Sequence, residues 1–164
     1  PTKVMKAKLA ILDVKMGRME ALRNVMQKMP LVPPLISFYV TSSYGKRRDP
    51  INRRWASHYG LDLGGGFKSK VYSTAPGVVT YAGWKGKYGK LVEITHGAGM
   101  KTRYSHLNKF YVKKGQKVKF HQKIGLLGRT GRSTGAHLHY EVVFRGRAKN
   151  PMKFIKAGRN VFQK

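Results

Sequence analysis

From residue 36 onward, the sequence consists of short apolar or alternating runs separated by turns that contain glycine. The clearest runs are residues 78–84, 91–95, 102–105, 124–127 and 138–144. Such runs are shorter than typical helices, and glycine turns at these intervals are characteristic of strands. The 19 glycines are spread through the chain, as many tight turns would require. The pattern therefore predicts a mainly β fold built on an antiparallel sheet.

In the first 29 residues, the spacing of the apolar side chains is different. Apolar side chains recur there at spacings of three and four, with lysine and arginine between them. They are Met5, Leu9, Leu12, Met16, Met19, Leu22, Met26 and Met29. This spacing predicts an amphipathic helix, which Pro30 and the following prolines end. The helix could form part of a coiled coil that meets a regulatory partner, or it could dock on the core of its own domain.

The charge of the chain limits its partners. The sequence has 34 basic and six acidic residues, a formal charge of +28, and residues 101–164 hold 17 of the basic residues against one acidic residue. This excess predicts an anionic partner such as nucleic acid, a phospholipid surface or an anionic envelope polymer. No recognition-helix pattern or aromatic RNA-binding motif accompanies the charge, so specific nucleic-acid binding is not expected.

The lack of cysteine and of long apolar runs limits the functions that are possible. The chain has no cysteine, which excludes disulfides and thiolate metal sites. No apolar run approaches the roughly 20 residues that cross a bilayer, so no transmembrane segment is expected. The start of the sequence, at Pro1, does not show the pattern of an export signal.

The stretch "STGAHLHYEV", residues 133–142, places two histidines two positions apart. In a strand, residues i and i+2 share a face, so His137, His139 and Glu141 would lie side by side. Elsewhere, "SHYGLDLGGG" supplies His58 and Asp62, whose spacing of four also allows both to reach one ion from an extended chain.

Two imidazoles and one carboxylate are a ligand set typical of a catalytic zinc site, where the fourth position is left for water. Such a site also needs a base that accepts the proton of the attacking water. The sequence has no HExxH motif to provide a glutamate for this task. The candidates are His106, in "RYSHL", and one histidine of the pair at 137 and 139.

With these motifs in place, the chain resembles the lysostaphin-type (LytM-like) zinc endopeptidases that cut peptide cross-links of bacterial peptidoglycan. The matching stretches follow the order of the family. They are "SSYGKRRDP", "HYGLD", "APGVVTYAG", "YGKLVEITHG", "TRYSHL", "VKKGQKV", "IGLLGRTGRSTGAHLHYEV" and "NP".

The resemblance implies an antiparallel, duplicated-hybrid-motif-like peptidase domain over residues 38–155. A helix would precede it at 1–29, with a Pro-rich linker at 30–37 and a basic tail at 156–164. His58, Asp62 and His139 would bind one zinc ion, and His106 and His137 would be the catalytic histidines that are not ligands. Glu141, Arg47 and Tyr104 would support the metal site or bind substrate.

The resemblance also implies partners and a location. The substrate would be peptidoglycan stem peptides, with the D-Ala to meso-diaminopimelate bond as the expected target, and the protein would act in the cell envelope, periplasmic or exported. Some relatives place a tyrosine before the first zinc histidine, and "INRRWAS" has none. The alternatives are a regulator without catalysis that binds the wall or activates an amidase, and a nucleic-acid-binding β domain.

Overall fold

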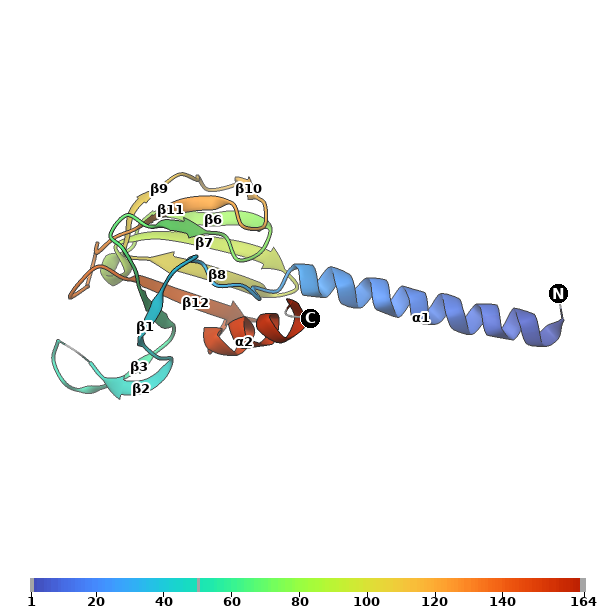
Figure 1. The fold of residues 1–164 in the computed structure, drawn as a ribbon. Helices are drawn as coiled ribbons and strands as arrows, with labels where there is room; N and C mark the ends of the chain where they lie inside the picture. Colours follow the sequence, from blue (N-terminus) through green and yellow to red (C-terminus); the bar gives the residue numbers. More distant parts are fainter. Residues whose placement is uncertain (1, 50, 163–164) are drawn as a thin grey trace.

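The computed structural model describes residues 2–49 and 51–162. An isolated N-terminal helix leads into a β domain that a second helix flanks (Figure 1). The elements of the first half are α1 (Lys3–Gln27), β1 (Tyr39–Ser42), β2 (Gly45–Arg48), β3 (Trp55–His58), β4 (Leu61–Gly64), β5 (Lys70–Tyr72) and β6 (Gly77–Trp84).

The second half begins with a short 3₁₀ helix, η1 (Gly86–Tyr88). The remaining elements are β7 (Lys90–Gly97), β8 (Met100–Ser105), β9 (Leu107–Phe110), β10 (Lys117–Val118), β11 (Lys123–Leu127), β12 (Leu138–Phe144), β13 (Arg147–Lys149) and α2 (Pro151–Phe162). The predicted mainly β fold with an N-terminal helix is thus confirmed.

The main sheet is antiparallel and runs in the order β1-β4-β12-β8-β7-β6-β10, with β13 paired to β12. A three-stranded sheet, β5-β11-β9, packs against it, and β2 and β3 form a separate hairpin. The buried apolar cluster joins the two larger sheets, because it combines side chains of β4, β7, β8 and β12 with Val71, Leu107, Ile124 and Leu127 from the smaller sheet. Since this core fixes β12 inside the main sheet, between β4 and β8, it also fixes the histidine that β12 carries.

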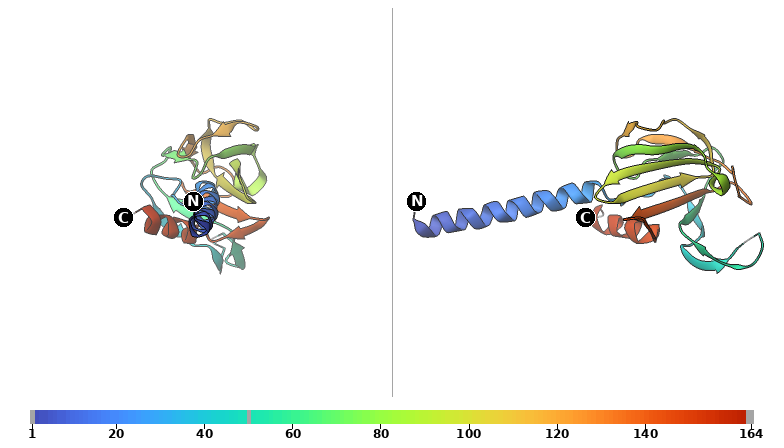
Figure 2. Two further views of the ribbon diagram at one scale, coloured as in Figure 1. Left: turned by 90° about the vertical axis from the view of Figure 1, so that its right-hand side faces the viewer. Right: turned by 180° about the vertical axis from the view of Figure 1, so that it is seen from behind.

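Thr2 caps the start of helix α1, because its side chain accepts a hydrogen bond from the Met5 amide. None of its residues is buried, and Leu9 and Met19 are 51% and 71% exposed. Figure 2 shows the helix projecting from the β domain as a single rod. The helix does not dock on the core of its own domain, because it extends away from the sheets.

The helix α2 packs beside β12 of the main sheet. The Asn150 side chain accepts a hydrogen bond from the Met152 amide at its start, and Ile155 enters the core. Gly158 lies directly against the Leu31 backbone, where any side chain would overlap it. The predicted basic tail, 156–164, begins inside this helix, and residues 163–164 lie outside the described residues. No helix in the described part of the chain is long and apolar enough to cross a membrane.

Candidate metal centre

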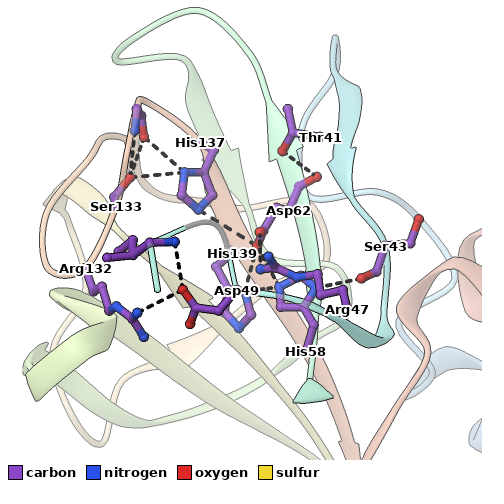
Figure 3. Close-up of polar contacts among 12 residues, drawn as sticks. Thr41, Ser43, Arg47, Asp49, His58, Asp62, Arg132, Ser133, His137 and His139 are labelled. Atoms are coloured by element: carbon purple, nitrogen blue, oxygen red, sulfur yellow. Dashed lines mark hydrogen bonds and ion pairs between the residues drawn. The ribbon is translucent and has the colours of Figure 1, made fainter. Parts of the chain in front are cut away.

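Three side chains from three strands converge where β3, β4 and β12 meet (Figure 3). His58 ends β3, Asp62 lies in β4, and His139 lies directly opposite Asp62 in the β4–β12 pairing. The His58 Nε2 atom lies 3.0 Å from Asp62 Oδ1 and 3.2 Å from His139 Nδ1, and the His139 Nδ1 atom lies 2.8 Å from Asp62 Oδ1. All three residues are buried. They form the one group among residues 2–49 and 51–162 whose donor atoms could together hold a metal ion.

Gly60 allows this convergence. It lies in the turn between β3 and β4. A Cβ atom at this position would lie 2.6 Å from the Tyr140 carbonyl oxygen and 2.7 Å from Cε1 of His139. Because only glycine fits, the turn can pass close enough to β12 for the two halves of the site to meet.

The outer nitrogen of each imidazole is held by an acceptor. His58 Nδ1 donates to the Ser43 carbonyl at 2.7 Å, and His139 Nε2 donates to Glu141 Oε1 at 2.9 Å. The inner nitrogens therefore face each other and the Asp62 carboxylate, where each can offer a lone pair to a metal ion. These three atoms, about 3 Å apart, are held together by positive charge, either a proton on an imidazole or a metal ion that replaces it. Tetrahedral zinc ligands at about 2.0–2.1 Å from the ion lie roughly 3.3 Å from one another, so the donor set fits zinc.

The electrostatics of the three residues agree with a cation site. Burial alone would raise the pKa of Asp62, but the hydrogen bonds to His139 and His58 hold it well below its usual value. Burial alone would lower the pKa of His139, but the contacts with Asp62 and Glu141 raise it to about 9. The site thus favours a positive charge between the carboxylates.

A second layer of polar side chains supports His139. Glu141 Oε1 also accepts from the Tyr88 hydroxyl at 3.0 Å, and Oε2 accepts from Arg103 Nη1 at 3.1 Å. Arg103 in turn donates through Nε to Glu93 Oε2 at 2.7 Å. Burial and the adjacent Glu141 carboxylate raise the pKa of Tyr88 to about 12, so its hydroxyl remains a donor at neutral pH. Sequence reasoning missed Tyr88, Arg103 and Glu93, since no motif links them to Glu141.

Two further histidines lie beside the three converging residues. The ring centroids of His106 and His137 are 4.7 Å apart, and His137 Nε2 lies 3.8 Å from Asp62 Oδ1. His106 Nδ1 donates to the Thr130 carbonyl at 2.7 Å, and His137 Nδ1 donates to the Gly135 carbonyl at 3.0 Å. The Nε2 atom of each ring is therefore the nitrogen that can accept a proton. Burial lowers the pKa of His106 to about 4, which keeps this ring neutral at neutral pH.

These groups line an open cavity of about 420 Å³. Arg47 reaches it from β2, with Nη2 3.4 Å from Asp62 Oδ2, and Lys87 and Arg132 add two more cations. The described residues that line the cavity include none from α1, so this helix does not cover the site.

Tyr104 lies elsewhere, which corrects the expectation that it would support the site or bind substrate. It is fully buried in the core, where its hydroxyl contacts Thr74 and Thr102. The reason is the alternation of β8: Arg103 faces Glu141 across the strand pairing, so its neighbour Tyr104 must point to the opposite face.

Comparisons with known proteins show which proteins the chain is similar to. The sequence model described as Peptidase family M23 matches residues 56–151. The peptidoglycan DD-endopeptidase ShyA of Vibrio cholerae is 42% identical over 135 residues, which are 82% of this chain and 31% of that protein. The chain thus spans about a third of the length of this curated relative.

Solved structures show the same fold. The crystal structure of a zinc-containing peptidase from Vibrio cholerae superposes with a TM-score of 0.70 at 40% identity, covering 76% of this chain and 39% of that one. The catalytic domain of the antimicrobial peptidase lysostaphin from Staphylococcus simulans gives a TM-score of 0.67 at 32% identity, covering 73% and 92%.

Proposed function

The chain belongs to peptidase family M23, and on that premise we propose that it is a zinc-dependent endopeptidase that hydrolyses peptide cross-links of bacterial peptidoglycan. The observation that carries the proposal is the donor set of His58, Asp62 and His139, with two more histidines beside it whose Nε2 atoms are free to accept a proton. A metal site that served structure alone would not need these two neighbours.

In this proposal His58 Nε2, Asp62 and His139 Nδ1 hold one zinc ion. When bound, zinc would polarise the scissile carbonyl and activate water for attack on it. Glu141 fixes the tautomer and the orientation of His139 through its hydrogen bond to Nε2. The similarity to a zinc-containing peptidase supports the choice of metal.

The two remaining histidines move protons. The Gly135 carbonyl holds the proton of His137 on Nδ1, so Nε2 can take a proton from the attacking water and pass it to the leaving amine. The Thr130 carbonyl orders His106 in the same way. Its buried position keeps His106 neutral, so it can accept a hydrogen bond from water or later donate one to the oxyanion once protonated.

The identity of the substrate is inferred from the charge of the cavity and from similar proteins. The cations Arg47, Lys87 and Arg132 line the cavity, and peptidoglycan stem peptides carry carboxylates. ShyA is named a peptidoglycan DD-endopeptidase. We therefore infer that this chain acts in the cell envelope and that the bond cut is D-Ala to meso-diaminopimelate. The overall charge of +28 would retain the protein on anionic envelope polymers, with binding that weakens as salt rises.

We also propose that the N-terminal helix binds a partner. Its apolar side chains are exposed from Val4 to Val25, which suits a regulatory protein or another part of a coiled coil. The division into helix 1–29, linker 30–37, peptidase domain 38–155 and tail 156–164 remains part of this proposal.

The zinc-loaded protein, incubated with sacculi from a diaminopimelate-type wall, should convert cross-linked muropeptide dimers into monomers that mass spectrometry detects. A chelator should stop the conversion. The variant His139→Ala should lose both zinc and cleavage, whereas His121→Ala should keep both, because His121 stacks on Tyr72 outside the site. Cleavage that survives in His139→Ala would overturn the assigned site. A zinc-loaded protein that cleaves nothing would favour the regulator without catalysis.

The roles of the two other histidines can be separated from metal binding. His106→Ala and His137→Ala should keep zinc but lose turnover by about 100-fold, the usual scale for a general base. Loss of zinc from either variant would show that the ligands are assigned wrongly.

A further inference from the structure

Arg132 stands out among the cations of the cavity, and we propose that it binds the carboxylate carried by the carbon next to the scissile nitrogen of the substrate. Arg132 would thereby restrict the enzyme to cross-links in which this carboxylate is free. The inference rests on the proposed function, because it names the substrate group that the same site recognises.

The backbone of Arg132 is held rigidly at the edge of the cavity. Its amide donates to the Lys87 carbonyl at 2.9 Å, and the preceding Gly131 packs against Gly89, with room for no side chain. The Thr130 hydroxyl donates to the Leu107 carbonyl at 2.8 Å and accepts from the Lys90 amide. These contacts hold the backbone of the loop that carries Arg132 in place beside the cavity.

The side chain of Arg132 reaches across the cavity to the β2–β3 hairpin (Figure 3). Its Nη2 atom donates to Asp49 Oδ1 at 2.9 Å, and the Asp49 carboxylate is itself held by the amides of Ile51 and Asn52. Among the described residues, no other hydrogen bond of the Arg132 guanidinium is formed. Asp49 therefore aims the group and leaves most of its N–H donors free for a ligand.

The other two cations of the cavity suit this task less well. Arg47 and Arg132 are each paired with a carboxylate, but the partner of Arg47 is Asp62, a proposed metal ligand, so turning Arg47 toward a substrate would disturb the metal site. Lys87 carries an ammonium group, which binds as a point charge and lacks the planar fork that matches a carboxylate. Arg132 offers that fork at the mouth of the site, with 34% of its side chain exposed.

Arg132 and His137 belong to the loop between β11 and β12, and both line the cavity. His137 is the histidine that we expect to protonate the leaving nitrogen, so the proposal assigns Arg132 to the leaving-group side of the site. In a D-Ala to meso-diaminopimelate cross-link, the carbon that bears the scissile nitrogen also bears a carboxylate. A bidentate contact between this group and Arg132 would orient the bond over His137.

Paired substrates test the inference. Purified muropeptide dimers are prepared with the carboxyl group next to the scissile nitrogen either free or amidated, and kcat/KM is measured for both with the full zinc-loaded chain. Wild-type protein should prefer the free carboxylate by about 10- to 100-fold, the effect expected when one hydrogen-bonded charged partner is lost. Arg132→Gln should reduce the rate on the free carboxylate to the amidated level, with little change on the amidated dimer.

Two further variants sharpen the test. Arg132→Lys keeps the charge without the fork and should restore only part of the preference. Arg145→Gln is the matched control: Arg145 packs on the Phe144 ring, away from the residues that line the cavity, and the preference should persist. Equal cleavage of both dimers by wild-type protein, or an unchanged preference in Arg132→Gln, would overturn the inference alone. Cleavage of neither dimer would instead overturn the proposed function on which it rests.

Discussion

Glu141→Gln should weaken zinc binding although Glu141 is not a proposed ligand. Glu141 Oε1 holds His139 at Nε2 with a separation of 2.9 Å, and the carboxylate is almost fully buried. Hydrogen bonds to charged groups contribute about 1.5–3 kcal/mol. At about 1.4 kcal/mol for each tenfold change, this predicts a loss of zinc affinity of roughly 10- to 100-fold, as is typical for partners of metal-binding histidines.

The assay is a competition titration of the metal-free protein against a chromophoric zinc chelator at pH 7.5. Glu20→Gln makes the same chemical change on the exposed face of α1 and should leave the affinity unchanged. The fold is checked by far-UV circular dichroism of both variants. An affinity of Glu141→Gln within twofold of wild type would refute the reasoning, because it would show that His139 is oriented without its carboxylate partner.

The remaining predictions concern stability. Gly131→Ala should lower the free energy of unfolding by more than about 1 kcal/mol, since φ is +75° and the new Cβ would lie 2.6 Å from the Lys87 carbonyl oxygen. Gly86→Ala, also at positive φ but in open space, should cost less, and urea denaturation that ranks them in the reverse order would contradict this. Burial lowers the pKa of His96 in the folded state, so the unfolded state binds its proton first as pH falls. Stability should therefore decline below about pH 6.5 by up to roughly 1.4 kcal/mol per pH unit, and thermal melts of His96→Gln should decline less steeply than those of wild type.

Strand periodicity accounts for the part of the site that was predictable. His139 and Glu141 are two residues apart on β12, so both must face one side of the sheet whatever surrounds them. His58 and Asp62 are close in sequence, and a short turn through Gly60 can bring them together. The histidine and carboxylate chemistry of a metal site was therefore readable from local spacing.

Tyr104 and Arg103 show what local spacing leaves open. The alternation in β8 requires that the two side chains face opposite ways, but it does not say which of them faces the metal site. Packing decides this, because Tyr104 fills the core and packs against the Tyr140 ring, which leaves Arg103 beside Glu141. Tyr88 likewise reaches Glu141 from a separate 3₁₀ turn, 53 residues away in sequence.

The sequence by itself determined the helix, the β character of the rest and the kinds of side chain that could bind a metal, because these follow from periodicity and residue chemistry over a few neighbouring positions. Tertiary structure alone decided that α1 stands free, that His58 and His139 meet across 81 residues, and that Arg132 pairs with Asp49 across the cavity. Such contacts depend on which strands pair and in which register. That choice is made by burial of the whole core and is not encoded in any short stretch of the chain.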